Sequence, residues 1–341
     1  MIELHKISKR VWLWTITHLG KLISRYFLRR PEYSYLFATR YPTFKSFLVD
    51  SINQTFYLLG ITWVIPFRSL IIEITNCCNL KCRHCPTHTK MDRSRVMLDL
   101  ELYKRIIDEN PQLDRLVLMN WGEPLLNPHL IEMIAYAHKN NIETHITTNG
   151  TLLTEEMMYA LLNSGLTRIS FSMDGVGETY RRIRGVDYEV LEETILTFCR
   201  LKDELHKDMQ VELSVTVFDE TEKDVEKLLD RWSSRVHFIK LRPQEITREV
   251  ARERSCRELW RTAVFLSNGV ITGCSVDYNG ILSLGDTKDG SSRAVFNSKK
   301  MRQLRRNHLK GVFSLPCSMC DEYHTEYARP RFNEPGVARN E

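Results

Sequence analysis

From residue 69 onward, strand-like and helix-like patterns alternate along the chain. Short runs rich in apolar and β-branched residues occur at 69–75, 115–119, 142–147, 167–173, 210–217 and 236–241. Amphipathic helical patterns lie between them at about 98–109, 129–140, 154–164, 188–205 and 221–232. Strands joined by crossover helices form a parallel sheet with right-handed connections. Six strands are too few for a closed eight-stranded barrel, so the pattern predicts an α/β fold, a partial (β/α)6 TIM-like barrel with its chemistry at the C-terminal strand ends.

The pattern changes after residue 242. A charge-rich connection precedes a hairpin signal at Asn268-Gly269, a turn at Asn279-Gly280 and a basic helix at about 298–309. This small α+β region also holds four cysteines, so we expect a separate module that a metal centre stabilises. The predicted division of the chain is an extension at 1–68, a barrel at 69–242, a cysteine-rich domain at 243–330 and a tail at 331–341.

The N-terminal extension is basic and rich in aromatic residues. Residues 1–30 hold seven Lys or Arg side chains and one acidic residue, Glu3, so most of the net charge of +5 is local. As a helix, residues 7–28 would carry an apolar side and a mostly basic side. This composition is typical of an interfacial helix at a membrane surface, but it also fits a helix packed on the barrel or bound to a partner protein. The main domain has no spread of basic charge, so we expect no nucleic-acid partner.

The chain has the composition of a globular protein, with 43% hydrophobic and 27% charged residues. The uncharged run at 11–20 is interrupted by polar residues and is followed by no small-residue cleavage site, so we predict no signal peptide. The longest uncharged stretch, 51–67, is shorter than the roughly 20 apolar residues that a membrane span needs. Close cysteine pairs without a secretory leader indicate metal binding in a reducing compartment. We therefore expect a cytoplasmic protein, either free or peripheral at the membrane.

Three cysteines with the spacing C-x3-C-x2-C, namely Cys78, Cys82 and Cys85, follow the first predicted strand. Three thiolates from one short loop can bind three corners of a cubane [4Fe-4S] cluster, which leaves the fourth iron open to a substrate or cofactor. The alternative is a zinc knuckle that takes His84 or His88 as its fourth ligand.

This spacing after the first strand of a barrel resembles the radical S-adenosylmethionine (SAM) enzymes. Three further motifs at later strand ends strengthen the resemblance, which covers about residues 69–328: Trp121-Gly122-Glu123-Pro124, Thr148-Asn149-Gly150 and Ser172-Met173-Asp174-Gly175. The first departs from the family's G-G-E-P motif, because Trp121 stands where the family has its first glycine. The resemblance implies that SAM contacts six residues: Gly122, Glu123, Asn149, Ser172, Asp174 and Arg184.

A second set of cysteines lies in the C-terminal region. It comprises Cys256, Cys274, Cys317 and Cys320. Four thiolates can saturate a [4Fe-4S] cluster, although four cysteines can also bind one zinc ion. The set resembles the SPASM and twitch extensions of radical SAM enzymes, in the shorter form with one auxiliary cluster. Two cysteines remain. Cys77 breaks the spacing of the first loop, and Cys199 lies on a predicted barrel helix, where a buried free thiol is the usual explanation.

The resemblance implies radical chemistry with two [4Fe-4S] clusters and SAM as cofactors. Reductive cleavage of SAM would give a 5′-deoxyadenosyl radical that abstracts a substrate hydrogen atom, and the auxiliary cluster could accept an electron from the substrate radical. We therefore expect an oxidoreductase that dehydrogenates or cross-links a small molecule or peptide and needs an external one-electron reductant. A redox-neutral epimerase, a modifier of a lipid or membrane-associated substrate, and a non-catalytic electron carrier remain alternatives. The sequence names no catalytic acid or base.

Overall fold

The computed structural model describes residues 41–243, 255–288 and 290–320. The strands are β1 (Ser69–Ile72), β2 (Arg115–Val117), β3 (Glu143–Thr148), β4 (Arg168–Ser172), β5 (Gln210–Val217), β6 (Phe238–Pro243), β7 (Val264–Phe265), β8 (Val270–Thr272) and β9 (Ser283–Asp286). The α-helices are α3 (Phe44–Leu58), α4 (Pro86–Thr89), α5 (Leu100–Asp108), α6 (Leu130–Lys139), α7 (Glu155–Asn163), α8 (Glu178–Arg184), α9 (Tyr188–Glu204), α10 (Val225–Trp232) and α11 (Lys299–Leu309). Short 3₁₀ helices are η2 (Pro124–Leu126), η3 (Glu222–Asp224), η4 (Arg257–Trp260), η5 (Ser292–Asn297) and η6 (Cys317–Met319).

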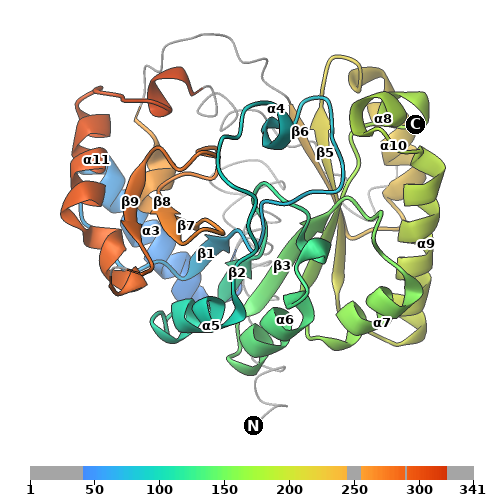
Figure 1. Ribbon diagram of the computed structural model, residues 1–341, viewed down its shortest axis with the longest axis horizontal. Coiled ribbons are helices and arrows are strands. Elements are labelled where there is room, and N and C mark those ends of the chain that lie inside the picture. The colour runs from blue at the N-terminus through green and yellow to red at the C-terminus, as the bar shows by residue number, and fades with distance from the viewer. Residues whose placement is uncertain (1–40, 244–254, 289, 321–341) are drawn as a thin grey trace, which may run out of the picture.

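The sheet has the strand order β6-β5-β4-β3-β2-β1-β7-β8-β9. Strands β1 to β6 are neighbours in chain order and pair in parallel, and the helices between them lie on the outer side of the curved sheet (Figure 1). The predicted α/β partial barrel is therefore confirmed. Its carboxyl-terminal strand ends lie together at one rim, where loops from different strands can share a site.

Some of the helices, among them α5 and α7, begin at a capping side chain. The Asp99 carboxylate accepts a hydrogen bond from the Leu102 backbone N–H (3.0 Å) at the start of α5. The Thr154 hydroxyl accepts from Met157 N (3.2 Å) at the start of α7. Such caps satisfy amides that have no partner in the first turn. The helix expected at 221–232 is divided, because its first turn is the 3₁₀ helix η3 and α10 begins at Val225.

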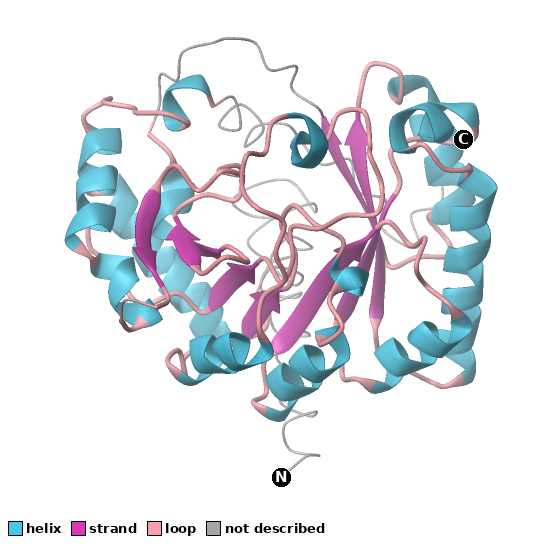
Figure 2. Cartoon of the chain, viewed as in Figure 1, coloured by secondary structure: helices cyan, strands magenta, loops and turns pink. Residues whose placement is uncertain are grey.

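The two faces of the parallel sheet differ in chemistry. Helices cover one face of the parallel sheet (Figure 2). On this face, side chains such as Ile146, Phe171 and Leu213 are fully buried and form the main core. The opposite face carries polar and charged side chains, among them His145 and Glu212. Alternation along a strand sends successive side chains to opposite faces. One face therefore stabilises the fold and leaves the other available for polar chemistry.

The C-terminal region continues the barrel's sheet. Strand β7 pairs in parallel with β1, and β7, β8 and β9 then form antiparallel pairs, with the predicted hairpin and turn between them. The sequence predicts a separate module, whereas this pairing joins the region to the barrel through nine hydrogen-bonded strands. The pairing covers the edge of β1 that an open barrel would otherwise expose.

The described part of the N-terminal extension is helical, as predicted, but its helix was not predicted individually. Helix α3 and the segment after it pack against the C-terminal region, because the buried Arg305 donates to the Thr62 carbonyl (2.9 Å) and Asn297 exchanges two hydrogen bonds with the backbone of Val64. The basic helix expected at 7–28 lies outside the described residues. Among those that are described, no helix is both long enough and apolar enough to cross a membrane.

Candidate functional site

The loop after β1 holds the first cysteine set. Cys78, Cys82 and Cys85 are half-buried thiols, and the Cys85 backbone N–H donates to the Cys82 carbonyl (3.1 Å). A second bond, from Arg83 N to the Ile183 carbonyl (2.9 Å), ties this loop to α8. The loop is thus anchored at its centre and bends so that its cysteines gather at the carboxyl-terminal rim of the barrel.

The electrostatic environment shows that these thiols influence one another. Burial raises the pKa of Cys78 to about 11, and the neighbouring Cys82 and Cys85 raise it further. Burial also raises the pKa of Cys82, while the guanidinium of Arg184 opposes that shift. The thiols of Cys78 and Cys82 are therefore protonated at neutral pH in the absence of a metal centre, and their ligation would release protons.

The donor set fits a polynuclear centre better than a single zinc ion. His84 stacks on Phe218, with ring centroids 4.2 Å apart, and its Nε2 lies 3.5 Å from the Glu220 carboxylate. This engagement leaves it poorly placed as a fourth zinc ligand. Within 41–243, 255–288 and 290–320, no three His, Cys, Asp or Glu side chains are placed to share one metal ion. In a cubane cluster each thiolate binds a different iron, so this wider spacing of donors is compatible with the cluster.

The segment after β2 lies directly on the cysteine loop. A side chain at Gly122 would place its Cβ 2.2 Å from the Thr75 carbonyl oxygen and 2.8 Å from that of Cys77, so only glycine fits there. The next residue, Glu123, donates its backbone N–H to the Cys77 carbonyl (2.8 Å). The predicted SAM motif is therefore in backbone contact with the loop that carries the predicted cluster ligands.

The Glu123 carboxylate joins the ends of β2 and β3. It is 2% exposed and accepts hydrogen bonds from the Thr148 hydroxyl (2.7 Å) and from the backbone N–H groups of Asn149 (2.8 Å) and Leu125 (3.2 Å). Burial raises its pKa, and the three donors oppose that shift. Each carboxylate oxygen can accept more than one hydrogen bond, so the group both fixes the rim and retains capacity for a ligand.

Asn149 connects the turn after β3 with the cysteine loop. Its side-chain amide donates to Asn79 Oδ1 (2.9 Å), and Asn79 in turn donates to the Thr151 hydroxyl (2.8 Å). Asn79 lies between the first two cysteines of the triad, and sequence reasoning did not single it out. The sequence feature that could have identified Asn79 is its position inside the cysteine loop.

Asp174 and Arg184 form a nearly buried ion pair beside the cysteine loop. Arg184 Nη2 lies 2.5 Å from Asp174 Oδ2, and Arg184 Nη1 donates to Cys82 Sγ (3.8 Å). Two buried polar atoms here, Arg184 Nε and the Tyr180 hydroxyl, have no hydrogen-bond partner. Ser172 is half-buried at the end of β4. Unpartnered buried donors are costly, so their presence next to Cys82 fits a site that receives a polar ligand.

Trp121 links this rim to the C-terminal region. Its indole Nε1 donates to the Ser275 carbonyl (2.7 Å), and its ring lies edge-on to Tyr278 with centroids 5.9 Å apart. Its own carbonyl accepts from the Thr87 hydroxyl in α4 (2.6 Å). The residue that departs from the family motif thus bridges the SAM motif and the segment after Cys274.

The second cysteine set is brought together from three elements. Cys256 precedes η4, Cys274 follows β8, and Cys317 and Cys320 flank η6. Burial raises the pKa of Cys274 well above its usual value, and Cys256, Cys320 and Cys317 raise it further in that order. Residues distant in sequence can influence one thiol only when they lie near it, so the other three cysteines are in the neighbourhood of Cys274.

The other residues considered from the sequence have structural contacts. Asp277 is 2% exposed and accepts from the Thr272 hydroxyl (2.7 Å) and from two backbone amides, which closes the turn before β9. Cys199 on α9 is half-buried, and its thiol donates to the Arg235 carbonyl (3.8 Å). Cys77 contributes backbone contacts to the loop after β2. Tyr323 and His324 lie outside the described residues.

A polar network on the inner face of the sheet was not predicted. The hydroxyl of Ser170 donates to Glu212 Oε1 (3.0 Å) and lies 2.7 Å from His145 Nε2. Because Ser170 donates to the carboxylate, His145 donates to Ser170 and carries its proton on Nε2. Burial, followed by nearby basic side chains, lowers the pKa of His145 well below its usual value, so the ring is neutral at physiological pH. The sequence feature that could have indicated this network is the polar residue at every second position of β3.

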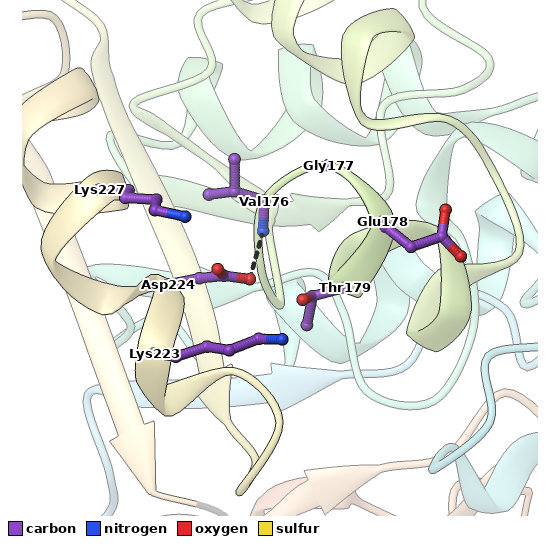
Figure 3. A pocket seen from close by; sticks show the side chains of 7 residues that line it. All are labelled: Val176, Gly177, Glu178, Thr179, Lys223, Asp224 and Lys227. Atoms are coloured by element: carbon purple, nitrogen blue, oxygen red, sulfur yellow. Dashed lines mark hydrogen bonds between the residues drawn. The ribbon is translucent and has the colours of Figure 1, made fainter.

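A hollow lies between α8 and α10. Its volume is about 390 Å³, and it is lined by residues 176–179 together with Lys223, Asp224 and Lys227 (Figure 3). The Val176 backbone N–H donates across it to the Asp224 carboxylate (3.3 Å). None of the predicted cysteine or SAM residues lines this hollow. The rim described above is therefore a separate site.

A parallel partial barrel with a cysteine triad at its rim and four further cysteines in the C-terminal region is an arrangement suited to iron-sulfur clusters. Residues 72–231 match the sequence model of the radical SAM superfamily, and residues 256–321 match that of the SPASM iron-sulfur cluster-binding domain. The chain belongs to the radical SAM superfamily and carries a C-terminal SPASM domain. Membership implies [4Fe-4S] clusters and S-adenosylmethionine as cofactors.

Curated relatives share only part of their length with this chain. The Fe-coproporphyrin III synthase of Methanosarcina barkeri is 35% identical over 118 residues, which are 34% of this chain and 30% of that protein. A PqqA peptide cyclase of Granulibacter bethesdensis is 35% identical over 123 residues, 36% of this chain and 33% of that protein. The match thus spans about a third of each relative.

Solved structures share the fold. The enzyme anSMEcpe with bound AdoMet has a TM-score of 0.56 at 16% identity, covering 75% of this chain and 87% of that chain. BtrN in complex with AdoMet and 2-DOIA has a TM-score of 0.51 at 18% identity, covering 72% of this chain and 88% of that chain. Streptococcus suis SuiB bound to the precursor peptide SuiA has a TM-score of 0.54 at 14% identity, covering 80% of this chain and 71% of that chain.

Proposed function

We propose that this protein is a radical SAM oxidoreductase that removes a hydrogen atom and then an electron from a small molecule or a peptide. The observation that carries the proposal is the electrostatic influence of Cys256, Cys317 and Cys320 on Cys274, in a region whose sheet is continuous with the barrel. Four thiolates can saturate an auxiliary cluster, and a saturated cluster is suited to accept an electron rather than to bind substrate.

The proposed SAM cluster ligands are Cys78, Cys82 and Cys85, and the proposed auxiliary ligands are Cys256, Cys274, Cys317 and Cys320. These assignments rest on spacing and on the mutual influence of the thiols. When bound, the reduced cluster and SAM supply a 5′-deoxyadenosyl radical that abstracts hydrogen from an unactivated carbon. Within this arrangement we assign residues 69–242 to the barrel and 243–330 to the auxiliary domain.

The chain's own residues would bind and orient SAM at the rim. Gly122 allows close approach of two loops, and Glu123 and Asn149 fix the ends of β2 and β3 through the hydrogen bonds described above. Asp174 and Arg184 hold a compact charge pair next to Cys82, and Ser172 lies at the end of the same strand as Asp174. Holding the ligand and the cluster loop through one rigid network limits misorientation of the reacting groups.

Relatives and neighbours show which substrate classes the scaffold can serve. One curated relative is named as a peptide cyclase, and one solved neighbour is bound to a precursor peptide. BtrN is instead described in complex with 2-DOIA. The proposal therefore includes both peptides and small molecules as substrates. A redox-neutral epimerase is the main competing function, since it would use the same barrel without net electron removal.

The experiment that tests the proposal is anaerobic reconstitution followed by an iron count and an assay of 5′-deoxyadenosine after addition of reductant and SAM. We expect about eight irons per chain and release of deoxyadenosine. The Cys317→Ala/Cys320→Ala variant should lose about four irons, and the Cys78→Ala variant should stop SAM cleavage. Cys199→Ala is the matched control, because Cys199 belongs to neither set, and it should keep both iron and activity.

Three results would contradict the proposal. About four irons with normal SAM cleavage would identify the C-terminal cysteines as a zinc site and remove the electron acceptor. Intact clusters without SAM binding would indicate an electron carrier. A substrate recovered at its original oxidation state after turnover would favour the epimerase.

A further inference from the structure

Helix α11 presents a strip of basic side chains to solvent. Lys299, Arg302, Arg306 and Lys310 follow one another at intervals of three or four residues, so they lie along one side of the helix. The neighbouring Lys300 is also exposed. The helix contains no acidic residue, and no carboxylate of the described residues forms an ion pair with any of these five groups. An unpaired strip of this kind favours an anionic partner.

Exposed apolar side chains lie in the segment 58–63, which contacts this strip through Trp63. Leu58 and Leu59 at the end of α3 are 79% and 68% exposed, and Trp63 is 53% exposed. Trp63 lies against the strip, because the Arg302 guanidinium is 4.8 Å from the centre of its ring. The segment that carries Trp63 is fixed there by the bonds between Asn297 and Val64. Trp63 therefore joins the basic strip to the segment that carries Leu58 and Leu59.

The other side of α11 borders a groove. The groove lies between β9 and α11, has a volume of about 420 Å³, and is lined by Lys299, Lys300, Gln303 and Asn307 together with Leu282, Leu284 and Leu304. Ile281 at its mouth is 58% exposed. Basic groups at the edge and aliphatic groups in the floor suit an amphiphile with an anionic head. Soluble surfaces seldom gather large exposed apolar groups in this way without a function.

We propose that this α11 surface, made of the basic strip, residues 58–63 and the groove, binds the surface of an anionic lipid bilayer. Lysine and arginine side chains attract anionic headgroups, and exposed Trp and Leu side chains insert at the boundary with the acyl chains. This inference goes beyond the proposed function and does not depend on it.

Charge argues against two other occupants. The chain's own residues 1–30 carry seven basic side chains and one acidic one, so the basic strip would repel them. The same charge makes them a second attachment to an anionic bilayer. A nucleic acid would also be attracted by the strip, but it would gain little from the aliphatic side chains of Leu58, Leu59 and Ile281. The bilayer is the partner that uses both kinds of group.

The test is co-sedimentation of the full-length, cluster-loaded protein with vesicles. One set contains phosphatidylcholine alone, and the other contains phosphatidylcholine mixed with phosphatidylglycerol. We expect binding to the anionic vesicles only, weakening as salt concentration rises. The Lys299→Glu/Arg306→Glu variant should bind at least about tenfold more weakly. The matched control is Lys223→Glu/Lys227→Glu, which changes the charge equally at η3 and at α10. Helix α10 lies on the opposite edge of the molecule from α11 (Figure 1), so this variant should bind as the unmodified protein does.

A second pair of variants separates insertion from charge. Leu58→Ser/Leu59→Ser removes the two most exposed apolar side chains without touching the core, and should weaken vesicle binding, whereas Val190→Ser on α9, 54% exposed, should not. Equal binding by Lys299→Glu/Arg306→Glu and its control would overturn the proposal. So would vesicle binding that depends only on the basic residues of 1–30. Tighter binding to RNA than to anionic vesicles, lost in Lys299→Glu/Arg306→Glu, would reassign the surface to nucleic acid.

Discussion

Glycine occupies position 122 because the loop after β2 lies against the backbone of the loop after β1. An alanine there would place its Cβ 2.2 Å from the Thr75 carbonyl oxygen and 2.8 Å from that of Cys77. Both oxygens belong to the backbone, so neither can rotate away. We expect Gly122→Ala to separate the SAM motif from the cysteine loop. The variant should lose about 1–3 kcal/mol of stability and bind SAM more weakly.

Anaerobic equilibrium dialysis with SAM and thermal denaturation would measure both effects. Gly60→Ala is the control, because a Cβ at Gly60 has no neighbour within 4 Å and any cost there comes from its positive φ alone. Unchanged SAM affinity in Gly122→Ala would show that the two loops can move apart without consequence for the ligand.

Trp121 gives a second prediction at the scale of single residues. Trp121→Phe would retain a ring beside Tyr278 but remove the donor to the Ser275 carbonyl. Losing this bond should destabilise the segment after Cys274 by about 0.5–1.5 kcal/mol. We expect faster hydrogen exchange at the amides of Val276 and Tyr278 and faster loss of the auxiliary iron to a chelator. Exchange rates equal to those of the unmodified protein would mean that the indole does not support this segment.

At the scale of elements, periodicity predicted most of the barrel. Five helices and six strands follow from residues that alternate with periods of 3.6 or 2, and their observed bounds differ by only a few residues. Helix α8, with seven residues, is too short to show such a period. The pairing of β7 with β1 could not be predicted, because it joins strands almost 200 residues apart through backbone groups that every residue carries.

The candidate site was predictable to the extent that it depends on local spacing. The cysteine sets and the motifs at Gly122, Asn149 and Asp174 have characteristic spacings, which a single sequence displays. The contact between Trp121 and Ser275 joins side chain and backbone across 154 residues, and only the folded chain reveals it. The inner-face network of His145, Ser170 and Glu212 could not be predicted for the same reason, since each of these residues lies on a different strand.

That network, which spans β3, β4 and β5, leads to a prediction about pH. Burial lowers the pKa of His145 below its ordinary value of 6.5, so the unfolded chain takes up a proton at a higher pH than the folded chain does. Stability is then complete above about pH 6.5 and declines as the pH falls below it, by up to about 1.4 kcal/mol per pH unit. The charged groups around the ring are Arg115, Arg168, Glu212, Lys240 and Arg242.

Anaerobic urea denaturation between pH 7 and pH 5 would measure this decline. His145→Gln keeps an amide donor toward Ser170 but has no proton to bind, so its stability should depend less on pH. His129→Gln is the control, because the His129 side chain is 45% exposed. Identical pH dependence in His145→Gln and the unmodified protein would exclude His145 as the source.

At the scale of the whole molecule, one buried carboxylate connects the barrel and the C-terminal region. Glu73, which follows β1, is 0% exposed and accepts from the hydroxyl (2.8 Å) and backbone N–H (3.1 Å) of Ser267. Arg93 Nη2 donates to its other oxygen (3.0 Å), and Arg93 Nε donates to the Tyr278 carbonyl (2.6 Å). These bonds hold the two regions together and position the strand that leads into the cysteine loop.

Removing the arginine would leave the buried carboxyl group of Glu73 without a counter-charge. Arg93→Met should therefore destabilise the protein by about 3–5 kcal/mol, and Glu73→Gln/Arg93→Met should recover much of that loss, because the amide needs no counter-charge. Lys104→Met, which breaks the exposed pair with Glu101, is the control and should leave the denaturation midpoint unchanged. Urea denaturation followed by tryptophan fluorescence would report both regions, since Trp232 lies in the barrel and Trp260 in the C-terminal region. If Arg93→Met had the same denaturation midpoint as the Lys104→Met control, the ion pair between Glu73 and Arg93 would not stabilise the junction of the two regions.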